Sequence, residues 1–391
     1  MTNFTYQIDT KIIFGKDEHK NVGKIISDYD IKRVLLHYGG GSIKSNGCYD
    51  DVISSLKEYN IEYFELGGVE PNPKVSLVRK GVEICKKENI QLILAVGGGS
   101  VIDSAKAIGF SALCDNDPWD YFEGIVKPSV AIPVGVILTL SASGSEMSSS
   151  CVITNDELGL KRGCGTELNR PKFSILNPEL TYSVNKYQTA CGIVDIMMHT
   201  LERYMTKSGA SSPTDDIAEV IVKSTMKNGL IALEDPNNYE ARAALMWNGT
   251  LSHNGLTGLG REYFMISHQI EHEISGMFDR IAHGAGLAIV FPAWCKWAYK
   301  YDIPRFLAFS KNIMGVNDLS SDEETILCAI DKLYKFFESI GMPTHLSDVG
   351  INDDSVFVEM AEKCTRYGKR ILGGFINYGV NEIVEILNIA K

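Results

Sequence analysis

The stretch LILAVGGGSVIDSAKAIG, residues 92–109, has the form of a buried strand, a glycine loop and a helix. Its first five residues are a continuous apolar run, which is typical of a parallel strand covered on both faces. The same alternation runs through the first half of the chain. Strands are expected at residues 32–38, 62–66, 91–96 and 130–138, with helices at 46–59 and 74–88. This alternation predicts an α/β fold with a doubly wound, mostly parallel sheet.

The character of the chain changes near Asn177 and Pro178. Strand-like pieces between residues 151 and 178 close the α/β region, and the proline ends the last of them. From residue 179 onward amphipathic helical patterns dominate. A length of 391 residues also favours two domains. We therefore expect an α/β domain at residues 1–178 and an all-helical domain at residues 179–391.

The composition is that of an ordinary globular protein, with 45% hydrophobic and 22% charged residues. A formal net charge of −11 argues against binding to nucleic acid or to an anionic membrane, because both need a basic surface. The nine cysteines include no CxxC pair, so we expect reduced and mostly buried thiols. No signal peptide and no apolar stretch long enough to cross a bilayer is found. The sequence is therefore interpreted as that of a cytoplasmic protein.

The glycine loop at residues 97–99 is suited to a bound phosphate. Glycines let a ligand approach the backbone closely, and the following helix offers free N–H groups and the positive end of its dipole. We expect Ser100 to cap a helix that begins at Val101, with Asp103 at the capping-box position. The loop matches neither GxGxxG nor a P-loop, so a tight turn with packing glycines is the alternative. The interpretation we prefer is a pyrophosphate site for a dinucleotide.

A second loop, VLLHYGGGSIKSNG at residues 34–47, favours NADP(H) over NAD(H). In dinucleotide-binding folds the end of such a strand often carries an acid that bonds the ribose 2′-OH. Here that place holds Gly39, and no carboxylate occurs between Leu35 and Tyr49. Ser42 and Lys44 would accommodate a 2′-phosphate, whereas an acid would repel it. A third segment, residues 137–150, is rich in small hydroxyl side chains that could line a nicotinamide cleft.

Ligand-type side chains recur at helical spacing in the second half of the chain. Asp195 and His199 lie four residues apart, as do His268 and His272, and His283 follows shortly after. Residues four apart share one face of a helix, so one cation can contact both. Four of the eight histidines fall in this arrangement. Solvated helix faces and hydrogen-bonded core histidines are the alternative, but imidazoles with a carboxylate suit Zn²⁺ or Fe²⁺.

Together these motifs resemble the iron-containing, or group III, alcohol dehydrogenases. The chain is most similar to their branch of NADPH-dependent butanol dehydrogenases and broad-range aldehyde reductases. The matching segments are TKIIFGK (10–16), YGGGSIKSNG (38–47), EPNP (70–73), AVGGGSVIDSAKAI (95–108), LTLSASGSEMSSSCVIT (138–154), NPEL (177–180) and the histidine segments. The resemblance covers essentially the whole chain. Asn177 departs from it, because relatives commonly have Asp-Pro there.

The resemblance implies a dehydroquinate synthase-like fold, with a dinucleotide-binding α/β domain and a helical domain that binds a metal. It implies that Asp195, His199, His268 and His283 are the ligands of Fe²⁺ or Zn²⁺, and that His272 faces the nicotinamide and the substrate. Spacing alone does not separate His268 from His272. The expected cofactor contacts are Gly39, Gly40, Gly41, Ser42, Asn72, Gly97, Gly98, Gly99, Ser100, Asp103, Thr139, Leu140, Ser145, Lys161, Leu180 and His272. Homodimers are usual in this branch.

The predicted reaction is reduction of short-chain aliphatic aldehydes to primary alcohols, with NADPH as donor and with His272 relaying the proton. An NAD-linked polyol dehydrogenase of glycerol or propanediol type stays open. So do a dehydroquinate-synthase-like lyase, a hydrolase with a metal-activated water, and a non-catalytic binding protein. Net consumption of reduced cofactor would separate a reductase from a lyase, and a requirement for nicotinamide would separate it from a hydrolase.

Overall fold

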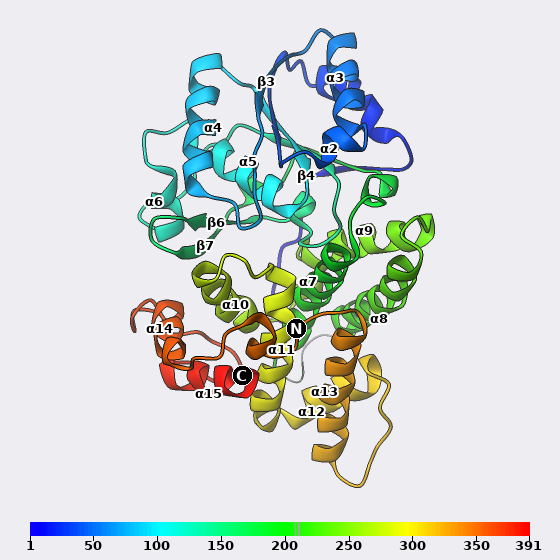
Figure 1. Ribbon diagram of the computed structural model, residues 1–391, viewed down its shortest axis with the longest axis vertical. Helices are drawn as coiled ribbons and strands as arrows, with labels where there is room; N and C mark the ends of the chain where they lie inside the picture. Colours follow the sequence, from blue (N-terminus) through cyan, green and yellow to red (C-terminus); the bar gives the residue numbers. More distant parts are fainter. Residues whose placement is uncertain (208, 210–211) are drawn as a thin grey trace. The chain divides into compact units, whose positions relative to one another are not determined.

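The computed structural model describes residues 1–207, 209 and 212–391 and divides them into two compact units (Figure 1). The sheet unit comprises Gln7–Asn185 and Asp235–Thr250. The helical unit comprises Met1–Tyr6, Lys186–Glu234 and Leu251–Lys391. Helix α9 (Tyr239–His253) contributes residues to both units. The boundary expected after residue 178 stays a prediction; the last strand of the sheet ends at Leu176.

The sheet unit contains six strands in the order β1-β8-β5-β4-β2-β3, and every pairing is parallel. The strands are β1 (Lys11–Phe14), β2 (Arg33–Tyr38), β3 (Glu62–Leu66), β4 (Leu92–Gly97), β5 (Val134–Leu138) and β8 (Phe173–Leu176). A separate antiparallel hairpin is formed by β6 (Ser150–Asn155) and β7 (Leu160–Gly165). The predicted doubly wound parallel sheet is therefore confirmed. Strand β5 begins later than predicted, directly after Pro133, which has no N–H for a ladder.

Both faces of the sheet are covered by helices. Successive side chains of a strand point to opposite faces, so alternate residues enter different hydrophobic cores. Leu35, Ala95 and Val136 face one core, with α4 (Val75–Glu88), α5 (Gly99–Ser111) and α6 (Pro118–Glu123). Their neighbours Leu36, Val96 and Ile137 face the other, with α1 (Val22–Ser27) and α3 (Cys48–Glu58). Figure 1 shows α3 apart from α4 and α5. Double coverage explains why β2, β4 and β5 are mostly apolar.

The helical unit is built around two almost fully buried helices, α7 (Lys186–Tyr204) and α11 (His283–Ala298). They contact each other, and α11 also contacts its neighbours in the chain and the C-terminal helix. The remaining helices are α8 (Ser212–Glu234), α10 (Ile266–Met277), α12 (Ile303–Ala308), α13 (Asp322–Ser339), α14 (Ser355–Cys364) and α15 (Val380–Ala390). Helix α7 nevertheless carries Asp195, His199, Glu202 and Arg203, all buried. Buried ionisable side chains are costly unless they are paired, so this helix marks a site.

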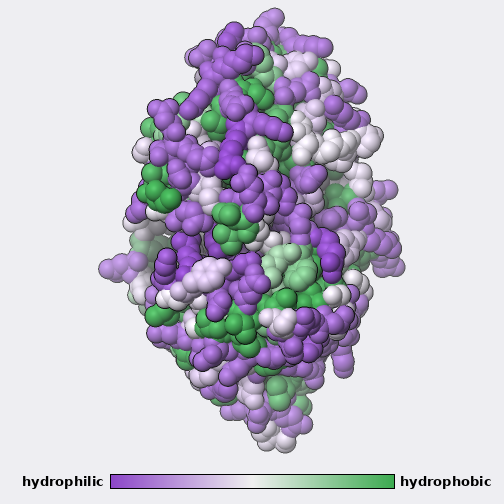
Figure 2. Space-filling model, turned by 60° about the vertical axis from the view of Figure 1, so that its left-hand side comes forward, coloured by the Kyte–Doolittle hydropathy of each residue, from purple (hydrophilic) through white to green (hydrophobic). Residues whose placement is uncertain are grey.

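None of the described helices is long and apolar enough to cross a membrane. The face of the molecule in Figure 2 is mostly hydrophilic, with hydrophobic side chains in scattered groups.

His37 is expected to make the sheet unit less stable in acid. Its buried ring donates from Nδ1 to the Leu66 carbonyl at 2.7 Å and accepts the Ser104 hydroxyl at Nε2, 2.9 Å away. Burial lowers the pKa of His37 from 6.5 to about 4. In the unfolded chain His37 is protonated near pH 6.5, whereas in the folded chain it stays neutral until the pH approaches 4. The contribution of His37 to the free energy of unfolding is therefore complete above pH 6.5 and is lost as the pH falls toward 4. The loss amounts to roughly 3 kcal/mol.

Urea unfolding of the wild type and of His37→Gln at pH 7, 5.5 and 4 measures this contribution. The free energy of unfolding of the wild type should fall more steeply with acidity than that of the variant. Parallel pH profiles would refute the assignment to His37.

Candidate active site

Asp195 and His199 lie on one face of α7, one turn apart, as their spacing predicted. Helix α10 brings His268 to the same place, so that the three side chains offer ligand atoms within 4.8 Å of one another. The first turn of α11 adds His283. Its Nε2 lies 3.8 Å from Asp195 Oδ1. The four residues proposed as ligands from the sequence are therefore brought together within the helical unit.

The atoms at the centre of this cluster are arranged as a divalent cation would require. Asp195 Oδ1 has His199 Nδ1 at 3.1 Å, His268 Nε2 at 3.7 Å and His283 Nε2 at 3.8 Å. Asp195 Oδ1 and His268 Nε2 are both buried without a hydrogen bond of normal geometry. A carboxylate and three imidazoles that converge in this way form a donor set suited to Zn²⁺ or Fe²⁺.

A glycine lets helix α11 come close enough to place His283. The position of a Cβ on Gly284 would lie 2.2 Å from the Cys191 carbonyl oxygen of α7. Any larger residue would have to push the two helices apart, because the obstacle is backbone. Gly284 therefore brings the first turn of α11, which carries His283, against the helix that carries Asp195.

The charges of the cluster are strongly coupled. Burial raises the pKa of Asp195, but the imidazoles of His199, His268 and His283 outweigh it and hold that pKa well below its usual value. Burial lowers the pKa of His199 to about 4, against the opposing effect of Asp195. Burial also opposes protonation of His268, yet Glu202 and Asp195 raise its pKa to about 9. A ligand nitrogen must be unprotonated, so a proton and a bound cation would compete for His268 Nε2.

His272 lies beside this cluster rather than at its centre. It forms a second group of possible donors with Glu271 and His283, and its ring centroid is 5.6 Å from that of His283. His272 is only half-buried, whereas His268 is buried. The geometry thus separates two histidines that spacing alone left equivalent.

The two glycine loops lie next to each other at one edge of the sheet. Strands β2 and β4 pair in register up to Tyr38 and Val96, so the loops that follow them start side by side. In the sheet β3 lies on one side of β2, and the next strand in sequence, β4, lies on the other side of β2. This is a topological switch point, where α/β folds bind their ligands. Thr139 joins the same edge, because its N–H donates to the Gly97 carbonyl at 3.0 Å.

The start of α5 differs from the prediction. The helix begins at Gly99 with Gly98 as its N-cap, and no side chain caps it. The expected cap by Ser100 and the capping-box role of Asp103 are therefore wrong. Asp103 instead accepts hydrogen bonds from Ser145 Oγ at 2.5 Å and from the Val152 N–H at 2.9 Å. The Asp103 carboxylate thus bonds residues that are distant in sequence, and the local sequence pattern gives no sign of these partners.

The other expected cofactor residues are placed in different ways. Lys161 Nζ donates to Asn72 Oδ1 at 3.0 Å, so these two residues, distant in sequence, meet. Leu180 packs into the hydrophobic core on the α1 and α3 face. At the second loop, positions for a Cβ on Gly40 and Gly41 are open, whereas one on Gly39 meets the Val69 carbonyl oxygen at 3.3 Å.

A carboxylate that the sequence reading did not include lies near this second loop. Glu65, at the end of the neighbouring strand β3, accepts hydrogen bonds from the hydroxyls of Tyr38 (2.8 Å) and Tyr49 (2.9 Å). Lys44 lies over the rings of the same two tyrosines, at 5.1 and 4.7 Å. The loop after β2 thus combines glycines with a cation, and the acid nearby on β3 already has a hydrogen-bond partner at each of its oxygens.

Comparison with known proteins identifies the family. The model for iron-containing alcohol dehydrogenases matches residues 9–178, and that for the C-terminal part of the Fe-containing alcohol dehydrogenase family matches residues 189–390. The chain belongs to the iron-containing alcohol dehydrogenase family. It is therefore an oxidoreductase of the alcohol dehydrogenase type, and the family implies a nicotinamide cofactor and a divalent metal ion. The resemblance noted from the motifs is confirmed.

Similar members of the iron-containing alcohol dehydrogenase family are named as butanol dehydrogenases or as an aldehyde reductase. NADH-dependent butanol dehydrogenase A of Clostridium acetobutylicum is 42% identical over 387 residues, which is 99% of each chain. The NADPH-dependent aldehyde reductase YqhD of Escherichia coli is 36% identical over 378 residues, 95% of each chain. The crystal structure of NADH-dependent butanol dehydrogenase A of Thermotoga maritima superposes with a TM-score of 0.96 at 39% identity, covering 100% of this chain and 99% of that one.

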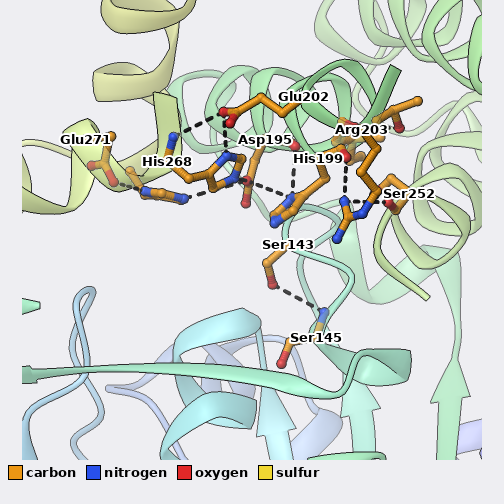
Figure 3. A network of polar contacts seen from close by, with 12 residues as sticks. Ser143, Ser145, Asp195, His199, Glu202, Arg203, Ser252, His268 and Glu271 are labelled. Carbon is orange, nitrogen blue, oxygen red and sulfur yellow. Dashed lines mark hydrogen bonds and ion pairs between the residues drawn. The ribbon is translucent and has the colours of Figure 1, made fainter. Parts of the chain in front are cut away.

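Three further residues surround the cluster of proposed ligands in this iron-containing alcohol dehydrogenase. Glu202 contacts His268, Glu271 contacts His283, and the ring centroid of His253 lies 3.9 Å from that of His199 (Figure 3 shows the two glutamates). The sequence analysis missed them all. Glu202 could have been found, because it lies seven residues after Asp195 and hence on the same helix face. Nothing in the sequence singles out His253.

Proposed function

We propose that this enzyme is a metal-dependent, NADP(H)-linked reductase of short-chain aliphatic aldehydes, which also oxidises the corresponding primary alcohols. The observation that carries the proposal is the convergence of His199, His268 and His283 on the buried carboxylate of Asp195. The names of its relatives, butanol dehydrogenases and an aldehyde reductase, support the substrate class. Those names divide between NADH and NADPH, so the choice of NADP(H) rests on the glycines, Ser42 and Lys44 after β2.

The residues of the helical unit hold the reaction centre. When bound, the cation polarises a carbonyl group and the nicotinamide supplies a hydride. Among the four proposed ligands only Asp195 would carry a charge, so a bound divalent ion would keep one net positive charge within its ligand set and could stabilise negative charge on the substrate oxygen. His272, beside the cluster, is placed to pass a proton to the product oxygen, directly or through water.

The test is the initial rate of NADPH and of NADH oxidation with butanal, on protein assayed for bound iron and zinc and then treated with a chelator. We expect rapid oxidation that prefers NADPH and stops on chelation. Preference for NADH would refute only the cofactor choice. Absence of any oxidation by metal-loaded protein, with butanal and a panel of other carbonyl compounds, would refute the reductase.

His272→Ala is expected to retain the metal and to lower kcat by about 10²- to 10⁴-fold, the usual contribution of a positioned proton donor. Metal content and kcat are measured on the same sample. His345→Ala is the matched control, because His345 lies on the surface beside Tyr334. Loss of metal from His272→Ala would make His272 a ligand and contradict its role as a proton relay.

A further inference from the structure

The metal centre needs each histidine ligand to present an unprotonated ring nitrogen. A neutral imidazole carries its proton on one of two ring nitrogens, and only the other can bind a cation. In water both forms interconvert. A site that binds metal tightly must therefore hold each ring in one form, usually by a hydrogen bond to the nitrogen that faces away from the ion.

Glu202 holds His268 in one form. Its Oε1 lies 2.8 Å from His268 Nδ1 (Figure 3). The carboxylate is itself fixed at the start of α10, where it accepts the N–H groups of Ser267 at 3.1 Å and His268 at 3.0 Å. An ionised carboxylate accepts but does not donate, so Nδ1 carries the proton and Nε2 faces Asp195. Glu202 is 2% exposed, so it has no solvent to compete for this bond.

Glu271 acts on His283 in the same way. Its Oε2 contacts His283 Nδ1, and the side chain is fully buried. Gly286 makes room for it, because a Cβ there would lie 2.7 Å from Glu271 Cγ. The third ring differs, because His199 Nδ1 lies 3.1 Å from the Asp195 carbonyl oxygen and 3.1 Å from Asp195 Oδ1 as well. Every Nδ1 in the cluster thus has an oxygen partner.

We propose that Glu202 and Glu271 are positioning residues of the metal centre. They hold His268 and His283 with the proton on Nδ1 and with Nε2 unprotonated, and each places a buried carboxylate behind a proposed ligand. Both effects strengthen the binding of a divalent ion. The inference rests on the proposed metal ligands and concerns residues outside that set.

The experiment measures the affinity of the metal-free full-length protein for Zn²⁺ by competition with a chelator. Glu202→Gln and Glu271→Gln keep an acceptor oxygen but lose the charge, whereas Glu271→Leu loses both. We expect each Gln variant to bind Zn²⁺ about 10- to 100-fold more weakly, and Glu271→Leu to be weaker still. The visible spectrum of bound Co²⁺ should change in Glu271→Leu, which a purely structural role would not predict.

Glu219→Gln is the matched control. Glu219 also bonds α7, by accepting the Tyr204 hydroxyl at 3.0 Å, but it contacts no proposed ligand. Its variant should bind Zn²⁺ as the wild type does. If Glu202→Gln does not fold, Gly286→Ala provides a second test, because its methyl group displaces Glu271 without changing any charge, and it should also weaken binding.

The outcomes separate this inference from the proposed function. Unchanged Zn²⁺ affinity in folded Glu202→Gln and Glu271→Gln would overturn it while leaving the metal centre intact. Two Zn²⁺ ions per wild-type chain would also overturn it, because Glu271, His272 and His283 would then form a second site. Failure of the wild type to bind any divalent ion would instead refute the metal centre itself.

Discussion

Replacing His268 by alanine is expected to remove the metal from this enzyme and its activity with it. His268 Nε2 is buried without a hydrogen bond and faces Asp195, so its loss deletes a central donor. The affinity for Zn²⁺ or Fe²⁺ should fall by more than about 100-fold, the upper limit for partners that only support a ligand. The variant also leaves the buried Glu202 without its imidazole partner, which lowers the stability of the metal-free protein.

Metal content by atomic absorption and the rate of aldehyde reduction, measured on one preparation, test this prediction. His272→Ala is the companion variant, because it lies one helical turn away and should keep its metal. His268→Ala with a full complement of metal would exclude His268 as a ligand.

The second large effect is expected at the loop after β2. Gly39→Asp should lower kcat/KM for NADPH about 100-fold relative to NADH, because a new carboxylate would face the 2′-phosphate. Two like charges about 4 Å apart near a protein surface repel by up to about 4 kcal/mol before screening by salt. The ratio of kcat/KM for the two cofactors is the quantity to measure, because losses common to both cancel.

Two controls separate charge from size at this loop. A Cβ on Gly39 meets the Val69 carbonyl oxygen at 3.3 Å, so Gly39→Ala should weaken both cofactors alike. A Cβ on Gly40 meets nothing within 4 Å, so Gly40→Asp adds charge without crowding. If Gly39→Asp affects NADPH and NADH equally, the 2′-phosphate does not bind at this loop.

The sequence predicted three neighbouring strands of the sheet almost to the residue. Strand β3 was found at the predicted bounds Glu62–Leu66, and β2 and β4 within one residue. Two other strands were missed. Strand β1 (KIIF) is a short edge strand, exposed at both ends, and β7 (LKRGCG) has no apolar run. The other edge strand, β3 (EYFEL), was found because it contains two aromatic residues and a leucine, whereas a four-residue strand or a polar hairpin arm leaves little pattern in the sequence.

Helix caps were harder to predict, because a side chain that could cap its own helix can instead form a hydrogen bond with a residue distant in sequence. Local spacing predicted that Asp103 would bond the start of its own helix. The folded chain instead offers Asp103 the Ser145 hydroxyl, which lies 42 residues away in sequence. A pattern three residues long contains no information about that competitor.

The sequence by itself determined the α/β and helical halves, the family, and the four residues proposed to bind metal. The two halves follow from local periodicity, and the pairing of ligand-type residues follows from spacing, because residues four apart share a helix face wherever the helix lies. The family and the choice of the four ligands follow from the resemblance of the motifs to the iron-containing alcohol dehydrogenases. Only the tertiary structure separated His268 from His272 by burial and brought Glu202, Glu271 and His253 to the cluster. Those contacts depend on which helices pack together. Gly284 leaves room for the backbone of Cys191 and Gly286 for the side chain of Glu271, and no local sequence pattern identifies either neighbour. Helical periodicity places a side chain on a face, whereas packing decides what that face meets.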